Sequence, residues 1–426
     1  MKTMLVLSMG ALLLAGTLSA QTPVPEWQAG VDKVKNLIQS NPAQASEEAG
    51  ELLKGKNKKN VDLVTSVAHV YLDAGKITEA QEYLAMAKKA NNKDPKVSVL
   101  EGDIALAQKN IGQACQLYEQ AIYFDPNCKE AYLKYAQAYK SASPTQAIEK
   151  LEQLKAVDPN CLEADRELAE VYYSGNRFGK AAEMYAKFID TPLATEDDML
   201  KYAFALFLNH DFEKSLQVAQ KGLQKNARHA AFNRLVMYNN TDLKRYEDAE
   251  KAADAFFNAS DRADYSYLDY RYYGALLSAL KKYDKAIIEY GKALDKDDTQ
   301  VDLWREISDA HEMNNNYAEA IAAYRKYYDA LAKDKKTPET LFQLGRLYYG
   351  QGTSSDSLAV QPADRKLALQ SADSVFTLVS EQAPDSYLGY YYLLKSDYPT
   401  SKEFWNKILA IDPTNATAKK ALEGIK

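Results

Sequence analysis

Glycine and proline are scarce in this sequence, with 18 and 13 residues respectively among 426. All-β sandwiches and barrels need frequent turns built from such residues, so the composition disfavours them and favours helices. The chain is also longer than the roughly 250–300 residues that a single hydrophobic core usually supports. We therefore expect either several helical domains or an extended array of repeats.

An excess of positive charge is missing as well. The formal net charge is −6, from 53 basic and 59 acidic residues. A mildly acidic chain has little electrostatic attraction for the phosphates of nucleic acids or of anionic lipids. At 46% hydrophobic and 26% charged residues, the composition is that of a folded soluble protein rather than a disordered one. We predict no nucleic-acid partner.

Motifs for catalysis or metal binding are also absent. There is no HExxH zinc motif, no glycine-rich phosphate loop and no GxSxG nucleophile turn. The four histidines, His69, His210, His229 and His311, do not have the spacing of metal ligands. Carboxylates are plentiful, but on helices they form the ordinary solvated surface. We therefore predict that the protein is not an enzyme and holds neither a metal nor a cofactor.

The three cysteines, Cys115, Cys128 and Cys161, are an odd number and cannot all pair within one chain. Cys128 and Cys161 each follow an Asp-Pro-Asn tripeptide, which suggests equivalent places in successive repeats. Stacked helices lie about 8–10 Å apart, beyond the roughly 7 Å between Cα atoms that a disulfide allows. We predict free, half-buried thiols.

Residues 1–20 have the order of a secretory signal peptide. Lys2 gives a positive start, the run from Leu5 to Leu14 is mostly apolar, and small residues follow up to Ala20. The apolar run is shorter than the roughly 20 residues of a membrane-spanning helix, although a retained N-terminal anchor is the alternative. The sequence therefore predicts cleavage near Ala20 and an exported mature chain without a transmembrane segment. Its expected location is the periplasm or the outer membrane surface of a Gram-negative bacterium.

The sequence repeats itself with a period of about 34 residues. Asp-Pro pairs occur at Asp94, Asp125 and Asp158 and again at Asp412. Between such markers, large apolar residues and small residues alternate with helical spacing, so each repeat holds two helices. The two clearest copies are displaced by the same interval at every position: Tyr270, Tyr273, Gly274, Leu277, Ala286, Tyr290 and Ala293, then Trp304, Ile307, Ser308, His311, Ala320, Tyr324 and Tyr327.

This pattern resembles the tetratricopeptide repeat. The resemblance implies an all-α fold, a right-handed α-solenoid of stacked antiparallel helix pairs, in which small residues let the two helices of a pair approach closely. We expect a degenerate helix pair over 21–60, a first half of the array over 61–257, a second half over 266–413 and a polar capping helix over 414–426. The polar segment 258–265 would be a joint between the halves.

One repeat near the C-terminus departs from the pattern. The interval from Tyr348 to Ala372 is more than twice as long as the equivalent interval from Leu277 to Ala286, which predicts an inserted loop over about 350–364. The tripeptide Asp356-Ser357-Leu358 in this insertion fits a motif at which some bacteria O-glycosylate exported proteins. Ser357 is therefore a possible modification site.

The resemblance implies that the first helix of each pair lines a groove in which a partner protein or peptide binds. Aromatic and arginine side chains contribute most to such interfaces, yet aromatics at helical spacing equally serve packing between repeats. Leu200, Phe204 and Phe207 stand out because their helix already has another apolar face. The groove positions predicted from helical phase are Arg166, Glu170, Tyr173, Leu200, Phe204 and Phe207, then Arg305, Asp309, Glu312, Phe342, Arg346, Tyr349, Tyr392 and Lys395.

The function that this sequence favours is a non-enzymatic scaffold of the bacterial cell envelope that binds a partner protein. Two alternatives stay open. The 31 tyrosines and the three tryptophans, Trp27, Trp304 and Trp405, could stack on sugars, which would make the protein a glycan binder. The apolar Leu200–Phe207 surface could instead be the seam of a homodimer.

Overall fold

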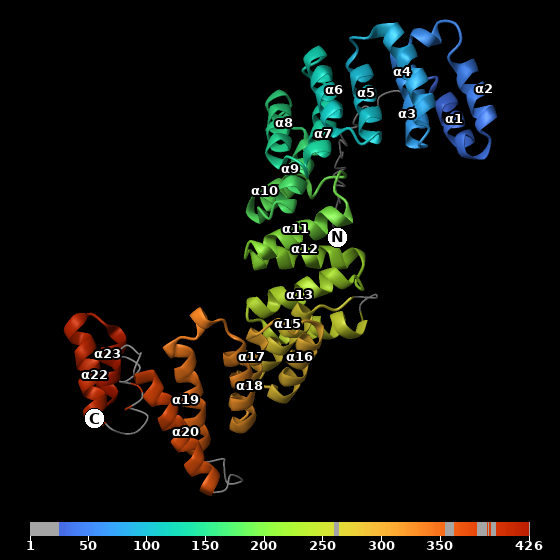
Figure 1. Cartoon of the computed structure of the whole chain (residues 1–426). Coiled ribbons are helices and arrows are strands. Elements are labelled where there is room, and N and C mark those ends of the chain that lie inside the picture. The colour runs from blue at the N-terminus through green and yellow to red at the C-terminus, as the bar shows by residue number, and fades with distance from the viewer. Residues whose placement is uncertain are drawn as a thin grey trace, which may run out of the picture. The chain divides into compact units, whose positions relative to one another are not determined.

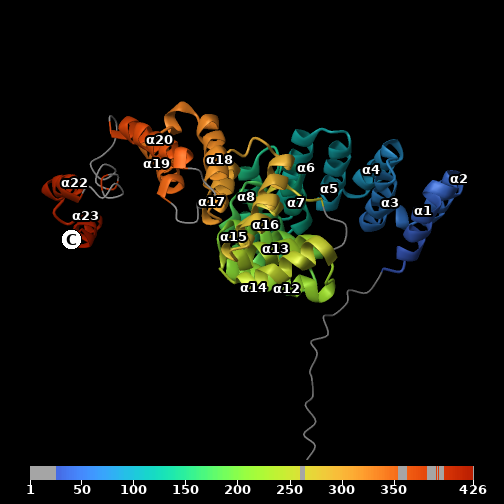
Figure 2. The same cartoon turned by 90° about the horizontal axis from the view of Figure 1, so that it is seen from below.

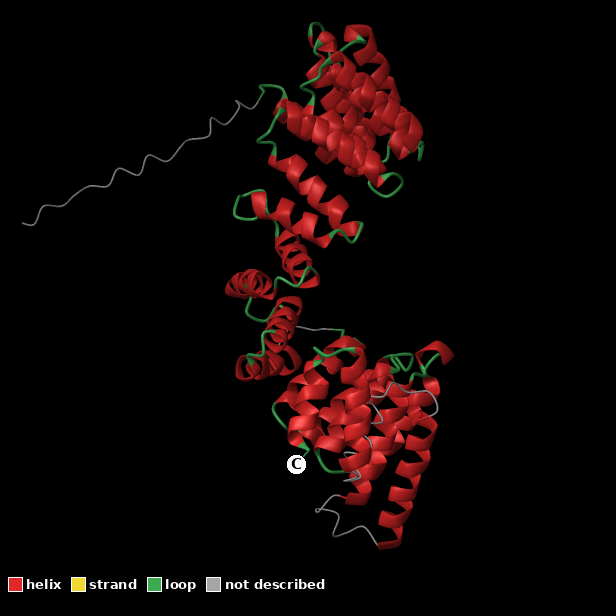
Figure 3. Cartoon of the chain, turned by 90° about the vertical axis from the view of Figure 1, so that its left-hand side faces the viewer, coloured by secondary structure: helices red, strands yellow, loops and turns green. Residues whose placement is uncertain are grey.

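The computed structural model describes residues 25–259, 264–353, 362–380, 390, 392 and 398–425. Over these residues the regular secondary structure is helical and contains no strand (Figure 3). Consecutive helices form antiparallel pairs, and neighbouring pairs such as α3–α4 (Val61–Asp73 and Ile77–Asn91) and α5–α6 (Pro95–Ala107 and Ile111–Phe124) lie side by side (Figures 1 and 2). The predicted all-α repeat fold is confirmed for this part of the chain.

The chain divides into two compact units, Met1–Phe188 and Ile189–Lys426. The described helices of the first unit are α1 Gln28–Ser40, α2 Pro42–Leu52, η1 Asn57–Lys59, α3, α4, α5, α6, α7 Lys129–Tyr139, α8 Pro144–Val157, α9 Leu162–Ser174 and α10 Phe178–Phe188. Those of the second unit are α11 Glu196–Leu208, α12 Phe212–Lys225, α13 Ala230–Asp242, α14 Tyr246–Asp254, η2 Ala255–Ala259, α15 Tyr267–Ala279, α16 Tyr283–Lys296, α17 Asp302–Met313, α18 Tyr317–Ala330, η3 Lys333–Lys335, α19 Pro338–Thr353, α20 Pro362–Ser380, α22 Tyr398–Ile411 and α23 Ala416–Gly424.

The joint predicted over 258–265 lies inside the second unit rather than at the boundary between units. Its described end at Tyr265 is packed, because the ring lies edge-on to Phe256 at 5.3 Å and its hydroxyl donates to the Phe257 carbonyl at 3.1 Å. The Arg234 guanidinium also donates to the Asp264 carbonyl at 2.9 Å. Aromatic contacts from outside the segment therefore hold its described end.

Polar side chains begin many of these helices. Asn60 accepts from the backbone N–H of Leu63 before α3, and Asp94 accepts from that of Lys96 with Pro95 at the first turn of α5. A reciprocal capping box of Thr195 and Asp198 begins α11. These side chains satisfy N–H groups that have no partner inside the helix, which explains why each helix begins at that residue.

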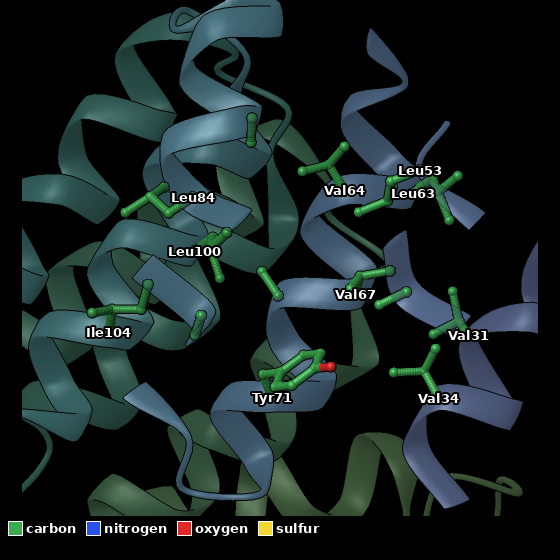
Figure 4. Packing of buried hydrophobic residues seen from close by; sticks show 14 of the residues in the cluster. Val31, Val34, Leu53, Leu63, Val64, Val67, Tyr71, Leu84, Leu100 and Ile104 are labelled. Carbon is green, nitrogen blue, oxygen red and sulfur yellow. The ribbon is translucent and has the colours of Figure 1, made fainter. Parts of the chain in front are cut away.

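The core of the first unit near the N-terminus is a layer of aliphatic residues shared by three helix pairs. Val34 of α1, Val67 of α3 and Leu100 of α5 are fully buried in it (Figure 4). Because α1 and α2 contribute to the same cluster as the repeats that follow, the degenerate first pair covers an apolar face that would otherwise be exposed. A helix pair cannot bury its apolar face alone, so each stabilises its neighbour.

Small residues set the distance between the helices, as the repeat pattern implies. A Cβ atom built at Gly102 of α5 would lie 2.5 Å from the Tyr118 ring of α6, and one at Gly274 would lie 2.6 Å from the Tyr290 ring of α16. Both tyrosines are almost fully buried. A side chain at either glycine would therefore force the two helices apart.

The predicted inserted loop of about 350–364 is described only at its two ends. Helix α19 extends to Thr353 and α20 begins at Pro362, so both helices run into the segment 350–364. Ser357 and Lys395 lie outside the described residues. Near the end of the chain α23 packs on α22, where Trp405 and Ala418 are buried together. No helix among the described residues combines the length and the apolar character that crossing a bilayer requires.

The turn inside most helix pairs holds one residue in the left-handed region of backbone conformation. These residues follow the repeat period: Gly75, Lys109, Asn176, His210, Lys244, Lys281 and Asn315. Glycine adopts this conformation without strain and asparagine tolerates it, whereas for a residue with a long side chain it costs about 1–2 kcal/mol. The chain therefore carries avoidable strain at these three lysines.

We expect Lys109→Gly to raise the free energy of unfolding of the first unit by about 0.5–1 kcal/mol. Relief of strain at φ 63° outweighs the greater freedom that glycine has in the unfolded chain. Lys109→Ala is the matched control, since it removes the same charge but keeps a Cβ, and it should leave stability unchanged. Urea unfolding of the wild type and the two variants measures the difference in stability. Equal unfolding midpoints for Lys109→Gly and Lys109→Ala would contradict the strain argument.

Candidate functional site

The predicted groove positions on α11 lie at the start of the second unit. Phe207 is only 9% exposed. Its ring contacts Phe212 at 5.7 Å, Tyr238 of α13 at 5.6 Å and Tyr272 of α15 at 6.2 Å between centroids. Phe207 is therefore a packing residue that joins three repeats.

The other two positions on α11 stay partly open. Leu200 and Phe204 are half-buried and rest against the same apolar cluster. Beside them, the rings of Tyr238 and Tyr272 stack at 4.0 Å, and the Tyr272 hydroxyl donates to Asp242 at 2.9 Å. Phe207 is thus part of the packed cluster beneath Phe204 and Leu200, which remain partly accessible. We call these two residues the α11 surface.

Further along the second unit, first helices are joined by ion pairs across one repeat. Arg234 donates to Asp269 at 2.6 and 3.1 Å, and Arg271 donates to Glu306 at 2.9 and 2.6 Å. Arg346, a predicted groove residue, donates to Glu312 at 2.6 Å. The partners in each pair are one repeat apart in the sequence. The ladder therefore connects neighbouring first helices.

The remaining predicted positions are distributed over both units. Arg305 lies over the Tyr327 ring at 5.8 Å, and Asp309 is exposed. Desolvation raises the pKa of Asp309 above its usual value although the charge of Arg305 opposes this. On α19, Phe342 and Tyr349 pack, with Tyr392, against a cluster around Leu344 and Tyr348.

On α9 of the first unit, Arg166 is half-buried, Glu170 accepts from the Tyr185 hydroxyl at 2.8 Å, and Tyr173 lies edge-on to Phe178 at 5.7 Å. These three residues share one helix, whereas the other described groove positions are distributed over α11, α17 and α19, with Tyr392 beyond α20.

Sequence reasoning missed a cleft in the first unit, with a volume of about 320 Å³. The first helices α3, α5 and α7 supply its walls, and the segment before α1 supplies its rim. Its lining residues are Pro25, Trp27, Asp62, Thr65, Ser66, His69, Lys96, Val99 and Glu130. We call it the α3–α7 cleft.

Thr65 and His69 of the cleft have the helical phase of Arg166 and Glu170 on α9, carried back by three repeats. Asp62, Lys96 and Glu130 follow one another at intervals of one repeat. The same phase argument, applied to the weaker N-terminal repeats, could have found them. It could not have shown that they enclose a cavity, because the rim comes from residues before the first helix.

A charged network is joined to the cleft through His69, which is one of its lining residues. The carboxylate of Asp103 on α5 accepts from the Nε2 atom of His69 at 2.9 Å and from the Tyr118 hydroxyl at 2.7 Å. Lys134 of α7 lies 2.9 Å from the same carboxylate. The Nδ1 atom of His69 faces the Thr65 carbonyl at 2.9 Å. Both ring nitrogens of His69 therefore face acceptors, which only the doubly protonated imidazolium satisfies.

The pKa values of this network agree with its geometry. Burial opposes the charge on His69, but the hydrogen bond and charge of Asp103 outweigh burial and raise the His69 pKa above its usual value. Burial likewise disfavours the charged Asp103, yet His69 and Lys134 together hold the Asp103 pKa below its usual value. The pair is thus ionised under mildly acidic conditions.

Titratable side chains elsewhere do not assemble a metal centre among the described residues. Cys115 and Cys161 are buried and Cys128 is half-buried, and all three are unpaired. Burial raises the pKa of the Cys115 thiol to about 11, so this thiol is protonated and weakly nucleophilic.

Stacked antiparallel helix pairs with a period of about 34 residues define a helical repeat protein. The family model of the tetratricopeptide repeat matches residues 68–128, 137–192 and 274–335. The chain is therefore a tetratricopeptide-repeat protein. Members of this family generally act as non-enzymatic scaffolds for protein–protein interaction.

Several solved structures are similar to this chain at low identity. A tetratricopeptide repeat protein from Parabacteroides merdae is 14% identical over 59% of this chain and 98% of its own, with a TM-score of 0.37. The C-terminal part of a repeat-containing protein from Cytophaga hutchinsonii is 16% identical over 68% of this chain and 99% of its own, with a TM-score of 0.41. For PilF of Pseudomonas aeruginosa the identity is 15%, the coverages are 52% and 99%, and the TM-score is 0.40.

At these identities and TM-scores, none of the three similarities indicates a ligand or partner for this chain. No curated protein sequence matches it.

Proposed function

We propose that the protein is a non-enzymatic scaffold of the bacterial cell envelope that binds a partner protein on the groove positions of its first helices. The observation that carries the proposal is the α11 surface. Phe204 and Leu200 stay half-exposed on α11, while Phe207 from the same helix is buried between three repeats. Aromatic side chains on a rigid helix are the residues that concentrate binding energy in protein interfaces.

The location in the cell envelope is supported by residues 1–20, which lie outside the described residues and have the order of a signal peptide. Export of the chain as far as the periplasm or the outer membrane surface follows from cleavage near Ala20. The alternative occupant of the α11 surface is a second copy of this chain. Capture of the chain itself, rather than of another protein, would indicate this alternative.

We expect Phe204→Glu to reduce capture of the partner at least tenfold in crosslinking of tagged full-length protein inside cells. A charge in the centre of an apolar contact is desolvated without a counter-ion. The binding free energy should therefore weaken by about 2 kcal/mol or more, as for loss of a hot-spot residue. Mass spectrometry identifies the captured protein. Phe207→Glu is not suitable for this purpose, because its side chain is interior and the variant would lose repeat packing.

Ile288→Glu is the matched control. Ile288 lies on α16, a second helix of its pair, and is 58% exposed, so the same change of charge falls away from the groove positions. Equal capture by the wild type and both variants would rule out the α11 surface. Recovery of the chain from the cytoplasm with residues 1–20 still attached would contradict the envelope location. Circular dichroism should show the same helix content in all three proteins.

A further inference from the structure

The α3–α7 cleft has the size of a small-ligand site rather than of a protein interface. Its volume of about 320 Å³ is at the lower end of the roughly 300–1,000 Å³ of small-molecule pockets. Polar groups converge on it from three successive first helices, and only Pro25, Trp27 and Val99 give it apolar walls. An apolar helix or a large hydrophobic side chain would desolvate these polar groups without replacing their hydrogen bonds.

The charges that line the cleft balance one another. The cleft is lined by the carboxylates of Asp62 and Glu130, the ammonium group of Lys96 and the imidazolium of His69. Asp103, which pairs with His69, and Lys134, which pairs with Asp103, add one charge of each sign. Lys96 pairs with Asp62, and Lys134 lies between Asp103 and Glu130. With no net charge, the cleft has no long-range attraction for an ionised ligand. A neutral polar ligand suits it better.

Hydrogen-bonding capacity nevertheless remains in the cleft. The ammonium group of Lys96 has three N–H donors, of which the Asp62 contact uses one. The Glu130 side chain is 53% exposed, and within the described part of the chain its ion pair with Lys134 is a long one, at 3.7 Å. The cleft therefore offers donors and acceptors side by side. Hydroxyl groups match such an array, because each can donate and accept at once.

Trp27 adds an aromatic wall. It is half-buried, packs on the core cluster around Val31 and also lines the cleft. An indole face beside polar groups suits the C–H face of a pyranose ring, whose hydroxyls point outward to the polar groups. A peptide main chain also donates and accepts, but it brings side chains for which the cleft has few apolar pockets.

We propose that the α3–α7 cleft binds a neutral saccharide unit, stacked on Trp27 and hydrogen-bonded by Lys96 and Glu130. This function is additional to the scaffold role assigned to the α11 surface. The two sites use different helices of different units, so loss of either activity leaves the other testable.

The test uses the mature protein labelled with 5-fluorotryptophan, which gives one ¹⁹F resonance for each of Trp27, Trp304 and Trp405. Trp27→Phe assigns the first. The probes are maltotriose, cellotriose and N,N′,N″-triacetylchitotriose, all neutral, with a capped neutral tetrapeptide, acetyl-Ala-Ser-Gly-Ala-amide, as the competing class. We expect at least one trisaccharide to shift the Trp27 resonance alone, with a dissociation constant of about 10 mM or lower.

Glu130→Ala should weaken that binding about tenfold or more, because a charged hydrogen bond contributes about 1.5–3 kcal/mol. Glu119→Ala is the matched control, since the Glu119 side chain on α6 is 51% exposed, close to the 53% of Glu130, and lies outside the cleft. The proposal is overturned if no trisaccharide shifts the Trp27 resonance at about 20 mM. A response to the tetrapeptide alone, or equal affinities for the Glu130→Ala and wild-type proteins, would overturn it as well.

Discussion

Replacement of Asp269 by alanine is expected to destabilise the second unit by about 3 kcal/mol. The Asp269 side chain is completely buried. It accepts from the Arg234 guanidinium at 2.6 and 3.1 Å, from the Tyr238 hydroxyl at 2.8 Å and from the backbone N–H of Ser266 at 2.7 Å. Removing it leaves a partly buried cation, a buried hydroxyl and an uncapped helix start without their acceptor.

The magnitude follows from the cost of an unpaired buried charge. Breaking a buried ion pair by deleting one partner costs about 3–5 kcal/mol. The lower end applies here because the Arg234 side chain keeps 23% exposure, and water can solvate part of its charge. The position of Asp269 at the start of α15 adds the loss of its capping box with Ser266.

Hydrogen exchange followed by mass spectrometry is the suitable measurement, because repeat arrays unfold in parts and a single global midpoint can conceal a local loss. Protection should fall in α13 and α15 and stay unchanged in α3 and α5. Asp298→Ala is the matched control at an exposed position and should change stability by less than about 0.5 kcal/mol. A loss below about 1 kcal/mol in Asp269→Ala would show that the Arg234 pair contributes little.

The stability of the first unit is expected to fall as the pH rises from about 6 to 8.5, and Asp103→Asn should abolish most of this change. The folded-state pKa of His69 is raised above 6.5, so the folded protein holds a proton that the unfolded chain releases. This contribution is complete below about pH 6.5 and is lost as the pH rises through the folded pKa.

At low pH, protonation of Asp103 limits the stabilisation by the His69–Asp103 pair. The folded pKa of Asp103 is lowered, so its contribution is present above the unfolded value of about 3.9 and is lost as the pH falls through the folded pKa. The His69–Asp103 pair therefore stabilises the first unit most between about pH 4 and 6.5. At pH 6, Asp103→Asn should cost about 2–3 kcal/mol, the range for a hydrogen bond between charged groups whose partners are partly solvated.

His311 provides a built-in control with the opposite sign. Burial lowers the His311 pKa, so His311 contributes stability in the second unit that increases as the pH rises through about 6.5. Hydrogen exchange at pH 6 and pH 8.5, corrected for intrinsic rates, separates the two units. His69→Gln should remove the pH dependence from α3 and α5 alone. A His69 pKa at or below 6.5 by NMR titration would contradict the assignment.

The amino-acid sequence by itself determined the helix pairs and their period. Tyr270 and Trp304, with the residues that follow each of them, recur one repeat apart because a helix must place its apolar residues on one side and its small residues against its partner. Capping residues such as Asp94 also mark helix starts through local hydrogen bonds. These features depend on residues within about one turn of each other, so a linear pattern contains them.

Only the tertiary structure decided which groove positions are accessible. Phe204 and Phe207 have nearly the same helical phase, yet Phe207 is buried because Tyr238 and Tyr272, from the next two repeats, close over it. The α3–α7 cleft depends in the same way on Trp27, which precedes the first helix. Local sequence decides which side chains lie on each face of a helix. Their burial and pairing depend on residues a whole repeat away, because the stacking of neighbouring helix pairs sets the distances between them.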